Sequence, residues 1–179
     1  MLIYCILFSP LYFIARFLKI KNINIPFNGL HELWYYTFFL YCVCIFSQTI
    51  LPSKEVLLGY EDAVGSSNFI LFETIRLYLS KLGGPMHTVA LYNLVGNIVL
   101  FVPFGFYIPS IYKQLQSFWK ICLVALAIPL FIETTQYFIG RSIDVDDVIL
   151  NTLAILIGYC LFYVVKRLLN FHIYKAEKS

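Results

Sequence analysis

The feature that most constrains this sequence is a set of five apolar runs, each long enough to cross a lipid bilayer. A spanning helix needs about 20 mostly apolar residues, and its backbone hydrogen bonds must be satisfied within the segment. The runs cover residues 2–18, 33–51, 89–108, 118–138 and 148–165. Only 13% of the residues are charged, against about 25% in a soluble domain. The sequence therefore predicts an all-α membrane protein with a bundle of about five transmembrane helices.

A further helix is predicted at residues 69–82, inside the long connection between the second and third runs. Apolar residues recur there at helical spacing, and polar residues occupy the opposite face. The apolar positions are Leu71, Ile75, Tyr78, Leu79 and Leu82, and the polar positions are Glu73, Arg76 and Ser80. Such a short, charged segment suits an amphipathic helix in the outer membrane interface or a lid packed on the bundle. No linker is evident, so residues 1–179 are expected to form a single integral membrane domain.

The positions of lysine and arginine predict the orientation, because these residues prefer cytoplasmic loops. If all five runs span, the basic residues at 16–21, 113–120 and 166–178 fall on one side, and most acidic residues fall on the other. The N-terminus is therefore predicted outside and the C-terminus inside. The first run is expected to be an anchor, because it lacks the positive start of a cleaved signal peptide. The scattered basic residues form no stripe suited to nucleic acid, so no such partner is expected.

Polar residues cluster near the predicted outer ends of the last three runs. They are Asn93, Asn97, Glu133, Gln136, Arg141, Asp144, Asp147 and Asn151. A carboxylate within an apolar helix costs roughly 2.5–3.5 kcal/mol, so Glu133 should face the bundle and find a partner, for which Arg141 is the candidate. Asp144, Asp147 and Asn151 follow helical spacing and are expected to share one face, whereas Asp146 is expected to be solvated or to cap that helix.

Two interpretations of this cluster remain open. One is a buried ion-pair and amide network that fixes helix packing. The other is a polar pocket that opens outward, which the concentration of polar groups at one depth favours. Glu133, Asp144 and Asp147, with Asn97 or Asn151, also offer oxygen ligands for a hard divalent cation. The sequence contains no metal signature, so neither a metal nor another cofactor is predicted, and the five cysteines are expected to be packing residues.

Two blocks within these runs resemble the VanZ-like family, which comprises membrane proteins associated with teicoplanin resistance. Residues 93–105 read NLVGNIVLFVPFG, and residues 133–158 read ETTQYFIGRSIDVDDVILNTLAILIG. The resemblance covers the eight polar residues of the cluster, together with Gly96, Phe101, Pro103, Gly105 and Gly158. Of these residues, four are expected to serve helix packing: Gly96, Pro103, Gly105 and Gly158. Ala154 stands where the family often has glycine, so a looser helix contact is expected there. The first half of the chain matches the family only in layout.

The resemblance implies a bacterial plasma-membrane protein connected with low-level resistance to lipoglycopeptides, and it does not imply an enzyme. One hypothesis is therefore a non-catalytic protein whose outer pocket binds a lipid-linked cell-wall component or the lipid tail of the drug, with membrane lipid as a further partner. The alternative is an intramembrane enzyme that modifies a lipid or polyprenyl-linked substrate, with Glu133 or Asp147 as acid or base and Arg141 holding a phosphate. Transport is less well supported, because the polar groups do not continue through the inner half of the bilayer.

Overall fold

The computed structural model describes residues 2–23, 28–50, 67–85 and 87–176, which are helical apart from short turns and one isolated β-bridge. This confirms the all-α class. The chain divides into two compact units, Met1–Tyr60 and Glu61–Ser179. Whether these units form a single domain stays a prediction.

The first unit contains two packed helices, α1 (Leu2–Ile23) and α2 (Gly29–Thr49). α1 is longer than the predicted run 2–18, because it continues to Ile23. The Arg16 guanidinium donates to both carboxylate oxygens of Glu32, at 2.6 and 2.8 Å. It also lies over the Tyr35 ring, 4.2 Å from the centroid. This two-pronged ion pair fixes the pairing of α1 with α2 near the start of α2.

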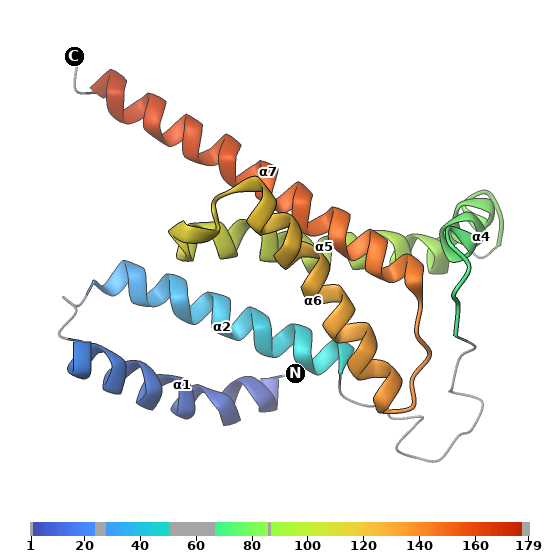
Figure 1. The fold of residues 1–179 in the computed structure, drawn as a ribbon, viewed down its shortest axis with the longest axis horizontal. Helices are drawn as coiled ribbons and strands as arrows, with labels where there is room; N and C mark the ends of the chain where they lie inside the picture. The colour runs from blue at the N-terminus through green and yellow to red at the C-terminus, as the bar shows by residue number, and fades with distance from the viewer. Residues whose placement is uncertain (1, 24–27, 51–66, 86, 177–179) are drawn as a thin grey trace. The chain divides into compact units, whose positions relative to one another are not determined.

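The second unit is built around the contact between α5 (His87–Ile111) and α7 (Val145–Ala176) (Figure 1). Gly105 and Gly158 lie where these helices cross. A Cβ atom on Gly105 would overlap the Ile155 carbonyl, and one on Gly158 would overlap the Val102 carbonyl. The missing side chains therefore allow backbone to meet backbone, as in other membrane helix pairs with small residues at the interface.

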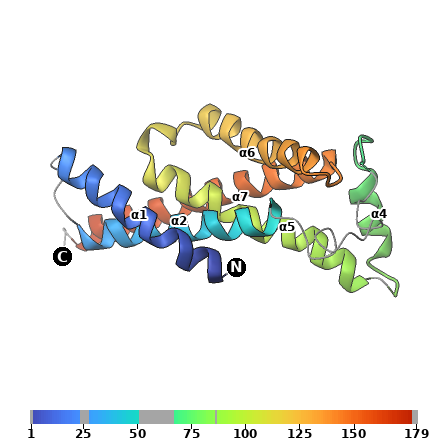
Figure 2. The same ribbon diagram turned by 90° about the horizontal axis from the view of Figure 1, so that it is seen from below.

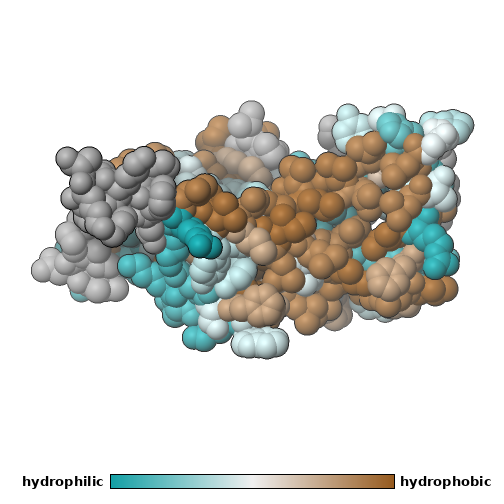
Figure 3. Space-filling view, turned by 90° about the horizontal axis from the view of Figure 1, so that it is seen from above, coloured by the Kyte–Doolittle hydropathy of each residue, from teal (hydrophilic) through white to brown (hydrophobic). Residues whose placement is uncertain are grey.

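α6 (Phe118–Phe138) packs on α7 and follows α5 after the short 3₁₀ helix η2 (Lys113–Leu115). The Thr152 hydroxyl on α7 donates to the Ala125 carbonyl on α6 at 3.2 Å. Ile121 and Ala125 are fully buried, whereas Leu123 and Phe131 on the same helix are largely exposed. Much of the surface in Figure 3 is hydrophobic. Such a surface suits contact with lipid rather than water.

Among the described residues, four segments are long and apolar enough to cross a membrane: Ile3–Asn22, Ala90–Ile111, Phe118–Phe138 and Val145–Leu169. They correspond to the first, third, fourth and fifth predicted runs. α2 covers most of the second run over 21 residues, but it is rich in Tyr and Trp and is not among the four. The expected number of spans is therefore roughly met. α7 (Val145–Ala176) begins slightly before the predicted run 148–165 and extends well beyond its C-terminal end.

α4 (Glu73–Lys81) confirms a helix within residues 69–82, although it starts four residues later than predicted. It lies across the end of the second unit and contacts α5 and α7 (Figure 2). Ile75, Tyr78 and Leu82 are half-buried, but Leu71 and Leu79 are 55% and 52% exposed. The predicted apolar face is thus divided between the bundle and the surface. These contacts agree with a lid on the bundle.

Candidate functional site

The candidate site forms around the turn between α6 and α7. Gly140 has a φ of +79°, which glycine adopts without steric cost. Its N–H donates to the Tyr137 carbonyl at 3.1 Å, and the Arg141 N–H donates to the Gln136 carbonyl at 2.9 Å. This pair of bonds is a Schellman motif, which ends α6 and reverses the chain. The reversal returns the chain to Glu133, whose Oε2 accepts a hydrogen bond from the Asp144 N–H at 3.1 Å.

Asp144 caps α7 rather than lying on its helical face. Its Oδ1 accepts from the Asp146 N–H at 2.9 Å, as expected of a residue that precedes a helix. The same oxygen accepts from the Asn68 side chain at 3.1 Å. The predicted face of Asp144, Asp147 and Asn151 therefore differs from the structure at its first member, because α7 begins at Val145.

A segment before α4 crosses this turn and is tied to it by backbone bonds. The Asn68 N–H donates to the Ile143 carbonyl at 2.8 Å, and the Val145 N–H donates to the Asn68 carbonyl at 3.1 Å. These bonds form the β-bridge between Asn68 and Asp144. The Asn68 side chain also donates to the Thr74 hydroxyl at 2.9 Å. Asn68 thereby links the start of α4 to the start of α7.

Asp146 caps α4 from another helix. It is completely buried, and its two oxygens accept from the backbone N–H groups of Phe72, at 2.6 Å, and Ile75, at 3.1 Å. Phe72 has a φ of +64°, an uncommon conformation for a bulky residue. The expectation that Asp146 is solvated is wrong. It does cap a helix, but that helix is α4 rather than its own.

The remaining polar residues lie on α5, α6 and α7 near the turn between α6 and α7. The Asn97 amide on α5 donates to Asp147 Oδ1 on α7 at 2.8 Å. Asn151 follows Asp147 by one turn and is only 4% exposed, and its Oδ1 is buried without a hydrogen-bond partner. Glu133 is also 4% exposed. We call Glu133, Asp147, Asn97 and Asn151 the acceptor cluster, because carboxylate and amide oxygens dominate it.

Tyr78 brings α4 into the electrostatics of this cluster. Burial raises the pKa of the Tyr78 hydroxyl, and the nearby charges of Asp147 and Asp144 raise it further. The neutral phenol is therefore the form that the site favours, and it can donate a hydrogen bond.

The other predicted site residues lie at the margin. Arg141 is half-buried and close enough to act electrostatically on Glu133, as Asp147 and Asp144 also do. Gln136 contributes its carbonyl to the α6 terminus. Asn93 is exposed on α5, one turn before Asn97. A Cβ on Gly96 would meet no atom within 4 Å, so in the described structure this glycine is not at a close helix contact.

Access to the cluster is uneven: Glu133 and Asn151 are each only 4% exposed, whereas Asn97 and Asp147 are half-buried. Whether a polar pocket opens outward at this end of the bundle stays a prediction. Within residues 2–23, 28–50, 67–85 and 87–176, no three His, Cys, Asp or Glu side chains converge as a metal site would require. The carboxylates of Asp144 and Asp146 are instead occupied by backbone and amide donors.

Sequence reasoning missed Asn68, Tyr78 and the role of Asp146. Asn68 stands far from the cluster in the sequence, and no spacing links it to Asp144. A signal for Asp146 existed: three acids within residues 144–147 are more than one helix start needs, which indicated a second N-terminus nearby.

Comparison with known proteins gives one match. The VanZ/LLP1 family model matches residues 38–166, a segment that contains the whole acceptor cluster. No curated protein and no solved structure matches the chain.

Proposed function

Because the chain belongs to the VanZ/LLP1 family, we propose that it is a bacterial envelope membrane protein whose acceptor cluster binds the head group of a lipid-linked cell-wall component or of a lipoglycopeptide. In this proposal binding lowers the susceptibility of the cell to teicoplanin. The orientation that places the cluster at the outer face is part of the same proposal.

One observation carries the proposal: Asn151 Oδ1 is buried without a hydrogen-bond partner. An unsatisfied buried polar atom costs roughly 1–3 kcal/mol, so a protein retains one where something else supplies the donor. Glu133 and Asp147 lie on the faces of α6 and α7 that meet at the same end of the bundle, and both are acceptors when ionised. The missing partner is therefore a donor.

The chemistry of the cluster limits the ligand class. Carboxylates repel phosphate, so a phosphate group would not seat against Glu133 and Asp147. Sugar hydroxyls, peptide amides and ammonium groups are donors that match the cluster. Glycan–peptide head groups carry all three, in wall precursors and in lipoglycopeptides. This argument removes the phosphate role considered for Arg141, which instead lies near Glu133 at the turn.

Access to the buried Glu133 and Asn151 would require movement of α4. This helix covers the site from one side and is held by the Asp146 cap and by Asn68. Its exposed Leu77 and Leu79, with Leu71 just before it, suit contact with the acyl part of an amphiphile while the head group is bound.

The test compares resistance with protein abundance. Glu133→Gln and Asp147→Asn each keep an oxygen for the hydrogen bonds from Asp144 and Asn97 but remove the charge. In a teicoplanin-susceptible strain that expresses the chain, both variants should lower the inhibitory concentration to that of the strain without it, at unchanged membrane abundance. Glu73→Gln is the matched control, because Glu73 is an exposed carboxylate on α4, and it should keep full resistance.

Two results would count against the proposal. If the abundance of the variants falls in parallel with resistance, the cluster only stabilises helix packing, because loss of the charge then lowers resistance by impairing folding. If the membrane lipids of expressing cells gain a modified species that Glu133→Gln abolishes, the chain is the intramembrane enzyme of the alternative hypothesis.

A glycopeptide without its acyl tail separates the two ligand sources. Resistance to this glycopeptide indicates that the chain binds a wall component, and susceptibility to it indicates that the chain binds the acylated drug.

A further inference from the structure

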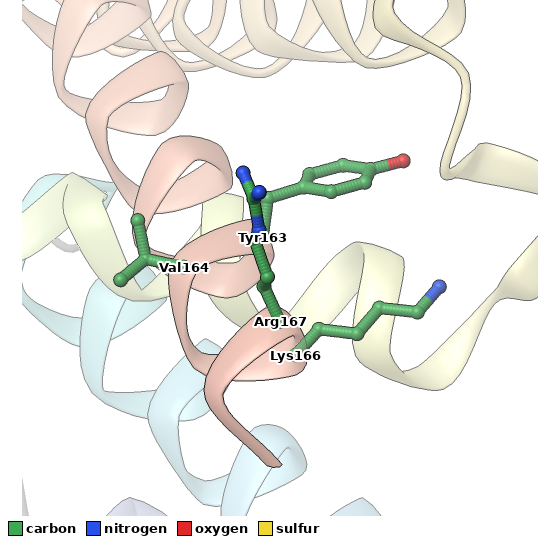
Figure 4. A pocket seen from close by; sticks show the side chains of 4 residues that line it. All are labelled: Tyr163, Val164, Lys166 and Arg167. Atoms are coloured by element: carbon green, nitrogen blue, oxygen red, sulfur yellow. The ribbon is translucent and has the colours of Figure 1, made fainter. Parts of the chain in front are cut away.

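A basic pocket lies at the end of α7 opposite the acceptor cluster. It has a volume of about 470 Å³ and is lined by Tyr163, Val164, Lys166 and Arg167. In Figure 4, Tyr163 and Lys166 extend from one side of α7, Val164 points the other way, and the Arg167 guanidinium lies between them. The pocket thus combines two cations with apolar surface, and its volume is within the roughly 300–1,000 Å³ of small-molecule sites.

Lys166 is held in place by neutral groups. Its Nζ donates to Gln116 Oε1 at 2.8 Å and lies 5.7 Å from the Phe162 ring centroid. Gln116 is fixed in turn, because its backbone carbonyl accepts hydrogen bonds from the hydroxyls of Tyr159, at 2.8 Å, and Tyr163, at 2.6 Å. Its amide donates to the Pro109 carbonyl at 2.9 Å. This arrangement orients the ammonium group without neutralising its charge.

Acidic residues are absent from the segments that surround the pocket, and the first acid after Arg167 in the sequence is Glu177. Residues 106–132 and 148–176 contain neither Asp nor Glu, while Lys113 and Lys120 add further positive charge in the α5–α6 connection. Arg167 is exposed, and its planar guanidinium suits two-pronged contact with a phosphate. The pocket therefore has a net positive charge that an anion would complement.

The level of the pocket in the membrane indicates which class of anion it binds. Nineteen residues separate Asp147 from Lys166 on α7, which at about 1.5 Å per residue is roughly the 30 Å thickness of a hydrocarbon core. Tyr112 and Trp119 are exposed at the same end of the unit, as aromatic residues are at membrane interfaces. The two cations consequently lie at the level of the lipid head groups, and the exposed Leu161 and Val164 lie toward the acyl chains.

We propose that this pocket is a binding site for an anionic phospholipid. Arg167 and the free N–H groups of Lys166 contact the phosphate, and one acyl chain lies along Val164 and Leu161. The site is separate from the acceptor cluster and does not depend on its function. Its consequence is that α7 is anchored to charged lipid at one end while its other end carries the polar site.

The test uses the full chain purified in detergent, with dioleoylphosphatidylglycerol as the anionic lipid and dioleoylphosphatidylcholine as the neutral-headed comparison. Native mass spectrometry counts the lipid retained. The chain should retain phosphatidylglycerol in preference, and Arg167→Gln should weaken that retention about tenfold while phosphatidylcholine stays unchanged. The described contacts of Arg167 include no packing role, so its loss should leave the helical content intact.

Lys120→Gln is the matched control, because it removes one positive charge at the same end, where Lys120 donates to the Gln114 carbonyl at 3.1 Å. It should retain phosphatidylglycerol as the unaltered chain does, and Lys166→Arg should retain it as well. Equal losses in Lys120→Gln and Arg167→Gln would overturn the proposal in favour of a diffuse basic belt. Displacement of the lipid by millimolar inorganic phosphate would overturn it in favour of a soluble anion.

Discussion

At the scale of single residues, three neighbouring carboxylates of similar chemistry perform different tasks. Asp144 caps α7, Asp146 caps α4, and Asp147 accepts from Asn97 on α5. Asp146 has the most demanding position, because it is fully buried and satisfies two N–H groups of another helix. Bonds from backbone N–H groups to a carboxylate are stronger than neutral ones.

Asp146→Ala should therefore release α4 while the bundle stays folded. Loss of a helix cap costs about 0.5–2 kcal/mol, so amide hydrogen exchange in α4 should accelerate roughly two- to thirtyfold. Hydrogen exchange of the protein in lipid nanodiscs measures this, with α5 and α6 as internal references. Glu73→Ala removes an exposed acid from the first turn of α4 and should change exchange little. Unchanged protection of α4 in Asp146→Ala would contradict the capping role.

At the scale of elements, the crossing of α5 and α7 decides whether the site forms. Asn97 and Asp147 meet because Gly105 and Gly158 let the two backbones approach further along the same helices. α6 joins this pair through Thr152 and the Schellman turn. The acceptor cluster is therefore sensitive to side-chain volume at the crossing, several turns away.

Gly105→Ala and Gly158→Ala should each destabilise the protein, because the added methyl group meets backbone that cannot move aside. Overpacking of this kind costs about 1–3 kcal/mol, or more where no neighbour can yield. Thermal unfolding in detergent gives the measurement. Gly96→Ala is the control on the same helix: its Cβ would have open space, and alanine gains up to about 1 kcal/mol of helix propensity. If Gly96→Ala lowered the unfolding temperature as much as Gly105→Ala, the role of Gly105 in the close contact of α5 and α7 would be refuted.

At the scale of the whole molecule, orientation depends on whether α2 crosses the membrane. Four segments qualify as spans by length and composition, and α2 is not one of them. If α2 crosses, the basic segments fall on one side, as the distribution of lysine and arginine favours. If it does not, Leu30 and Ser80 lie on the same side of the membrane.

Labelling of intact cells distinguishes these arrangements. In a chain without its five cysteines, Ser80→Cys should react with a membrane-impermeant thiol reagent, and Leu30→Cys should react only after permeabilisation. Both positions are exposed in the structure, so failure to react reports sidedness. Reaction at both positions in intact cells would contradict a crossing α2, and the reverse pattern would place the acceptor cluster at the inner face.

The sequence by itself determined the helical class, the approximate positions of the helices and the family. That Asn97, Glu133, Asp147 and Asn151 form one functional site stays a prediction. Hydrophobic runs and polar spacing are local properties, so they can be read without a fold. Only the tertiary structure decided that Asp144 and Asp146 act as caps, that Asn68 and Tyr78 lie beside these residues, and that Glu133 and Asn151 are buried. These facts depend on which segments meet across roughly 70 residues of chain, and no periodicity within a helix encodes a partner on another one.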